Sequence, residues 1–79
     1  MNEESGWKNR VRERRLLALV ATETELAKSV GLSRSTISRI ENQKVFLTSR
    51  NALKIAEALN CTLNDLYVED DKEGENGDA

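Results

Sequence analysis

Polar side chains with guanidinium and hydroxyl groups follow one another on one side of a short predicted helix. They are Arg34, Ser35, Ser38 and Arg39. A helix advances about 100° per residue, so the opposite side carries Ile37 and Ile40 and faces a core. Guanidiniums and hydroxyls provide hydrogen-bond donors and acceptors suited to the edges of nucleic-acid bases. These four side chains are therefore the candidates for reading bases.

Residues at and beyond the two ends of this helix are candidates for contacts with phosphate. They are Ser33, Asn42, Lys44 and Arg50. When a helix enters the major groove, its ends meet the sugar-phosphate strands, and such contacts position a protein without reading sequence. An ordinary solvated helix face is the alternative, because most polar helix faces only contact water. The tight turn that precedes this helix favours contact with DNA.

Two short helices joined by this turn are predicted between residues 22 and 43. Thr22 is a suitable N-cap for the first helix, and Glu25 stands three residues later, where it completes a capping box. Gly31 ends that helix, because glycine readily adopts the left-handed backbone of such a turn. Ser33 then caps the second helix, which is predicted to run to about Asn42.

The segment LAKSVGLSRSTISRIEN, residues 26–42, closely resembles the phage repressor and Cro type of helix-turn-helix regulator, also called the xenobiotic response element family. The likeness continues more loosely through NALKIAEALNCTLNDL, residues 51–66, and covers roughly residues 11–67. It implies a compact all-α domain of five helices, with the helix-turn-helix at the second and third. It also implies binding to double-stranded DNA through the third helix, as a homodimer on a palindromic operator.

The resemblance further implies an ion pair between Arg15 in the first helix and Glu41 late in the recognition helix. Glu41 lies beside the apolar side of its helix, where an unpaired carboxylate would be costly and a bidentate arginine is a suitable partner. The alternative is that Glu41 is solvated. This chain has one more residue between Arg15 and Leu26 than the family pattern, which we place near residues 20–21.

Two positions depart from the family pattern. Glu23 stands where many relatives have a glutamine that contacts phosphate. A carboxylate would repel phosphate but stabilises a helix N-terminus, so Glu23 is not counted as a DNA contact. Gln43 stands where relatives often have glycine, which makes a left-handed cap less comfortable there.

The remaining helices are assigned from apolar periodicity. The first is expected from Lys8 to about Leu19, a fourth over residues 49–59, and a last short helix after Thr62. Phe46 and Cys61 are expected to pack rather than to bind DNA, metal or a redox partner. The apolar residues expected in the core of these helices are Val11, Leu16, Ala18, Leu19, Ala52, Leu53, Ile55, Ala56, Leu59, Leu63, Leu66 and Tyr67.

Charge is distributed unevenly along the 79 residues. The whole chain has a formal net charge of -2. Residues 69–79 contain six acidic residues and one lysine, whereas residues 1–68 contain eleven basic and eight acidic residues, a net charge of +3. We therefore expect a disordered N-terminus at 1–6, a basic DNA-binding domain at 7–68 and a disordered acidic tail at 69–79.

Several classes of protein are disfavoured by composition. With one cysteine and no histidine, neither a disulfide framework nor a zinc site is expected, and the four glycines form no phosphate-binding loop. We predict no enzymatic activity, no cofactor and no metal. Without a signal peptide or transmembrane run, we predict a cytoplasmic, nucleoid-associated protein of bacterial or phage origin that binds no membrane.

The sequence thus predicts a transcriptional regulator that binds duplex DNA, most plausibly a repressor that occludes a promoter. One alternative is an antitoxin that represses its own operon and binds a toxin through its tail. Another is a protein-interaction module of the same fold, which would use the acidic tail or the apolar residues near Phe46.

Overall fold

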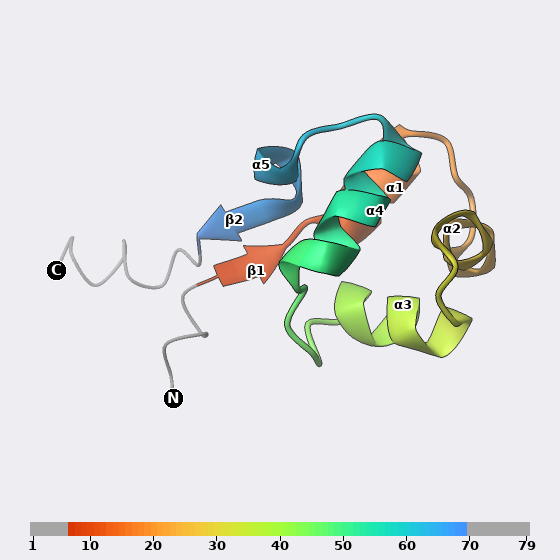
Figure 1. Cartoon of the computed structure of the whole chain (residues 1–79), viewed down its shortest axis with the longest axis horizontal. Helices are drawn as coiled ribbons and strands as arrows, with labels where there is room; N and C mark the ends of the chain where they lie inside the picture. The colour runs from red at the N-terminus through yellow and green to blue at the C-terminus, as the bar shows by residue number, and fades with distance from the viewer. Residues whose placement is uncertain (1–6, 70–79) are drawn as a thin grey trace, which may run out of the picture.

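The computed structural model describes residues 7–69, and it contains five helices and one short two-stranded ribbon (Figure 1). The elements in chain order are β1 (Trp7–Asn9), α1 (Val11–Leu17), α2 (Glu23–Val30), α3 (Arg34–Glu41), α4 (Ser49–Leu59), α5 (Leu63–Leu66) and β2 (Tyr67–Glu69). The predicted helical domain with five helices is confirmed. The two segments predicted to be disordered lie outside the described residues, apart from Glu69.

Serine and threonine side chains begin four of the helices, as the sequence indicates. Thr22, Ser33, Thr48 and Thr62 each accept a hydrogen bond from the backbone amide three residues later. This bond satisfies one of the amides that a helix N-terminus leaves unpaired. The box at Thr62 is reciprocal with Asp65, whereas Glu25 accepts from Ala21 rather than from Thr22.

The core lies where α4 packs against α1, α2 and α5, while α3 packs against α1 and α2 (Figure 1). A single cluster of buried apolar side chains fills it: Val11, Leu26, Ala27, Val30, Ile37, Ile40, Leu47, Ala52, Ile55, Ala56, Leu59 and Leu66. Cys61 and Tyr67 are half-buried against this cluster, in agreement with their predicted packing. Burial of these side chains is the main favourable term that holds the helices together.

Helix α1 corrects the predicted first helix in both extent and orientation. It begins at Val11 rather than Lys8 and ends at Leu17. Its buried residues are Val11 and Arg15, whereas Leu16 is 53% exposed and Leu19 is 89% exposed. Burial of Arg15 for its ion pair turns the neighbouring leucine outward, because adjacent helical positions differ by about 100°. Ala18 is also exposed, because it lies beyond the last residue of α1.

Two further apolar residues predicted for the core are exposed, Leu53 at 54% and Leu63 at 39%. Phe46 is also 57% exposed, although its ring stacks on Tyr67 with centroids 6.3 Å apart. A five-helix domain this small has few layers, so one side of each outer helix meets water even where the residue is apolar.

The ribbon of β1 and β2 was not predicted. It is antiparallel, with Trp7 opposite Glu69, Lys8 opposite Val68 and Asn9 opposite Tyr67. The backbone of Glu69 therefore pairs with β1, one residue beyond the Val68 at which the domain was expected to end. Pairing between segments about sixty positions apart leaves no local pattern in a sequence, and a three-residue strand is too short to show alternation.

Candidate nucleic-acid interface

Helix α3 has one buried side and one polar side. Ile37, Ile40 and Glu41 are buried. Among the predicted base-reading residues, Arg34, Ser35 and Arg39 are exposed and Ser38 is half-buried. The predicted polar face is therefore accessible, with Ser38 the most recessed of the four.

The turn between α2 and α3 sets the direction of this face. Gly31 has φ 74°, in the left-handed region, and the Leu32 amide donates to the Ala27 carbonyl at 3.0 Å. Leu32 is half-buried against the core, and Ser33 then caps α3. A short connection of this kind is the defining feature of a helix-turn-helix, and it leaves the second helix exposed along one side.

The predicted phosphate contacts lie at the ends of α3 and just beyond it. Lys44 and Arg50 are exposed. Asn42 is exposed as well, but its side-chain amide donates to the Ser38 carbonyl at 2.9 Å and its Oδ1 accepts from Arg12 at 2.9 Å. In Figure 1 the loop after α3 and the first turn of α4 lie on the lower side of the domain, next to α3. The segments that contain these residues therefore lie close to α3.

A buried ion pair joins α1 to α3. The Arg15 Nε donates to Glu41 Oε2 at 2.7 Å and its Nη2 to Oε1 at 3.2 Å. A third donor, Nη1, bonds the Val20 carbonyl at 3.0 Å and so fixes the connection from α1 to α2. This connection contains Leu19 at φ 66°, in the left-handed region.

Glu41 is charged at neutral pH because its partners outweigh its burial. Burial alone would raise the pKa of this carboxyl, but the hydrogen bond and charge of Arg15 lower it, and a hydrogen bond from Arg12 lowers it further. The net effect is a pKa below the ordinary value of 4.5. The exposed Arg12 contributes through its Nε, which lies 3.3 Å from Glu41 Oε1. The recognition helix is thus bound to α1 by two arginines.

Asn9, for which the sequence predicted no role, and Gln43, noted only as a departure from the family pattern, hold the other side of the C-terminus of α3. Asn9 is buried, and its Nδ2 donates to the Ile40 carbonyl at 2.8 Å while its Oδ1 accepts from the Val11 amide at 3.1 Å. Gln43 bonds the backbone of Asn9. An asparagine next to charged residues is typical of a surface, so the sequence gives no indication that Asn9 is buried and bonds α3. For Gln43, the departure from the glycine of the family pattern was the only indication of its contact with Asn9.

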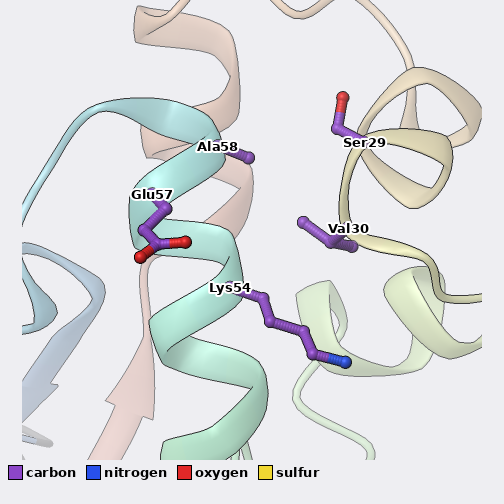
Figure 2. Close-up of a pocket in the computed structure, with 5 residues that line it drawn as sticks. All are labelled: Ser29, Val30, Lys54, Glu57 and Ala58. Carbon is purple, nitrogen blue, oxygen red and sulfur yellow. The ribbon is translucent and has the colours of Figure 1, made fainter.

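A hollow of about 400 Å³ lies between α2 and α4 (Figure 2). Its lining consists of Ser29, Val30, Lys54, Glu57 and Ala58. All of these except Val30 are exposed. The hollow is an open groove, whereas small-molecule sites are usually enclosed and mostly apolar.

Within residues 7–69, no group of three or more histidine, cysteine, aspartate or glutamate side chains lies close enough to hold a metal ion. None of the helices in this described part is long and apolar enough to cross a membrane.

The comparisons with known proteins agree with this geometry. The family described as helix-turn-helix matches residues 11–66 of the chain. A relative in Archaeoglobus fulgidus, described as an uncharacterized HTH-type transcriptional regulator, is 44% identical over 52 residues, which span 66% of this chain and 74% of the relative.

The fold and the exposed side of α3 define a DNA-binding domain of the helix-turn-helix class. The chain belongs to the helix-turn-helix family, and the predicted resemblance to repressor and Cro-type regulators is confirmed.

Proposed function

We propose that this protein is a transcription regulator that binds double-stranded DNA sequence-specifically and represses by occluding a promoter. The observation that carries the proposal is the exposed polar side of α3, which follows a tight turn and is opposite two fully buried isoleucines. In this arrangement, α3 enters the major groove. The base-reading side chains are Arg34, Ser35, Ser38 and Arg39.

Phosphate contacts orient α3 in the groove. Ser33 and Asn42 lie at its two ends, Lys44 follows in the loop, and Arg50 comes from the first turn of α4. Their contribution is independent of base sequence and falls with added salt, because each neutralised phosphate releases condensed counterions. Binding rather than catalysis is the activity.

We further propose that the protein acts inside the cell as a homodimer on a palindromic operator. A single short recognition helix makes few base contacts, and two half-sites about one helical turn apart double them. Val45 and Phe46 are exposed apolar residues close to the end of α3. They supply a surface for a partner protein, whether a second copy or another regulator.

Arg39 is the residue on which the test depends. A guanidinium can bond both acceptors of a guanine, and a good bidentate pair is worth about 1–3 kcal/mol of discrimination against the wrong base. Arg39→Ala should therefore remove the preference at one base position of each half-site while the fold stays intact. Lys44→Ala should weaken binding to all duplexes equally and lower the salt slope by about one counterion.

The experiment titrates the wild type and both variants against DNA selected from a random pool and against scrambled duplexes, at several salt concentrations. The proposal would be contradicted if the wild type showed no sequence preference at physiological salt. It would also be contradicted if Arg39→Ala kept the full preference of the wild type for the selected DNA. The first result would favour the protein-interaction module, and a co-purifying toxin would favour the antitoxin.

A further inference from the structure

A carboxylate holds Arg34, the first residue of α3, in the free protein. Nη1 of Arg34 donates to Oε1 of Glu23, the first residue of α2, at 3.3 Å. The side chain of Arg34 is 59% exposed, whereas that of Glu23 is 19% exposed. The largely buried carboxylate of Glu23 therefore binds the guanidinium of Arg34, which is exposed to solvent at the proposed base-reading surface.

Glu23 is the more covered partner of the two. It lies close enough to the buried ion pair to affect it: the pKa of Arg15 is raised by its hydrogen bond to Glu41, and the charge of Glu23 adds to this effect. Because the side chain of Glu23 is 19% exposed and that of Arg34 is 59% exposed, Arg34 has more room to leave the pair by rotating its own side chain.

We propose that Glu23 competes with DNA for Arg34 and thereby sets the affinity of α3, because the guanidinium must leave Glu23 before it contacts a base or a phosphate. The inference rests on the proposed function, because it requires Arg34 at the DNA surface.

The strengths of the competing contacts set the size of the effect. An exposed ion pair of this kind contributes less than about fivefold to an equilibrium, similar to one screened phosphate contact. A bidentate arginine–guanine contact contributes about 5- to 150-fold. The ion pair lowers the availability of Arg34 in the free protein by up to about fivefold, and a strong base contact bears this whole cost. A weak phosphate contact bears only part of it, so Glu23 lowers the affinity for the operator at least as much as the affinity for a random duplex.

Two simpler roles for Glu23 must be distinguished from this one. Its charge could repel phosphates directly, without any part for Arg34, or it could only stabilise the N-terminus of α2. Direct repulsion acts equally whether or not Arg34 is present. Competition requires Arg34, so the two effects separate in a double-mutant cycle.

The experiment compares four proteins: wild type, Glu23→Gln, Arg34→Ala and the double variant. Each is titrated against a scrambled duplex at low salt and against the selected operator. We expect Glu23→Gln to tighten binding to the operator by about two- to fivefold, with an equal or smaller gain on the scrambled duplex, and to have little effect in the Arg34→Ala background.

Two further variants sharpen the test. Glu25→Gln removes the same charge from the same helical turn, but Glu25 accepts from the Ala21 amide and does not bond Arg34, so the gain on the operator should be smaller than for Glu23→Gln. Glu23→Asp keeps the charge but shortens the side chain away from Arg34. Competition predicts tighter binding to the operator for Glu23→Asp, whereas direct repulsion predicts no change. This variant also serves if Glu23→Gln does not fold.

Equal gains from Glu23→Gln with and without Arg34 would overturn the inference and leave the proposed function standing. A lower melting temperature with unchanged DNA binding would do the same, because it would reduce Glu23 to a helix-stabilising residue. Absence of binding by the wild type to any duplex at low salt would overturn both.

Discussion

Gln43 bonds both backbone groups of Asn9, from a position 34 residues further along the chain. Its Oε1 accepts from the Asn9 amide at 3.1 Å, and its Nε2 donates to the Asn9 carbonyl at 3.1 Å. The side-chain amide thus takes the place of a neighbouring strand along β1. Gln43 itself has φ 61°, in the left-handed region, at the end of the recognition helix. Gln43 therefore follows the end of α3 and bonds it to β1.

We predict that Gln43→Ala destabilises the domain by about 1–3 kcal/mol, because it removes two hydrogen bonds worth roughly 0.5–1.5 kcal/mol each. Gln43→Gly loses the same bonds but adopts the left-handed backbone without strain. The Gln43→Gly variant should consequently have a higher melting temperature than the Gln43→Ala variant. Thermal and urea melts of the three proteins test the order. An alanine variant as stable as the wild type would show that these bonds contribute nothing.

Loss of one partner of the buried ion pair should be severe. Glu41→Ala leaves the Arg15 guanidinium buried without its carboxylate, which costs roughly 3–5 kcal/mol in buried pairs, out of a typical total of 5–15 kcal/mol. Glu57→Ala removes an exposed carboxylate from α4 and should change stability by less than about 0.5 kcal/mol. Urea unfolding curves measure both. Similar stabilities for the two variants would mean that the pair is not important for the fold.

The lowered pKa of Glu41 makes the stability of the domain fall at acidic pH. A carboxyl whose pKa is lower in the folded state stabilises the fold fully above its ordinary value of 4.5 and loses this contribution as the pH falls through the lowered value. Stability of the wild type should therefore decline below about pH 4.5. Glu41→Gln should be less stable at neutral pH and decline less steeply with acid. Parallel pH curves for the two proteins would contradict this account.

Truncation after Glu69 should strengthen binding to scrambled DNA at low salt. Residues 70–79 contain five acidic residues and one lysine, whereas residues 1–69 contain eleven basic and nine acidic residues, a net charge of +2. Removal of like charge reduces repulsion of DNA, and the gain should fade as salt screens it. The cut falls after Glu69 because β2 ends there. Unchanged binding in titrations across salt would instead favour a protein partner for these residues.

The sequence was sufficient wherever the determining contacts are local. The caps at Thr22, Ser33 and Thr62 depend on an amide three residues away, and the turn at Gly31 depends on one residue's left-handed backbone. For the same reason, the side of α3 that faces water could be read from residue spacing alone. These features predicted the helices of the motif and the candidate DNA-reading face, although which bases they contact remains a prediction.

The tertiary structure decided the features that join distant segments. Nothing near Leu16 in the sequence indicates that it is exposed; it turns outward because Arg15 must reach Glu41, 26 residues away. The ribbon of β1 and β2, and the bonds between Asn9 and Gln43, likewise depend on how the helices bring both ends of the domain together. The contact of Glu23 with Arg34 arises because the turn sets the first residues of α2 and α3 side by side. Long-range polar contacts carry no periodic signal, so only packing determines them.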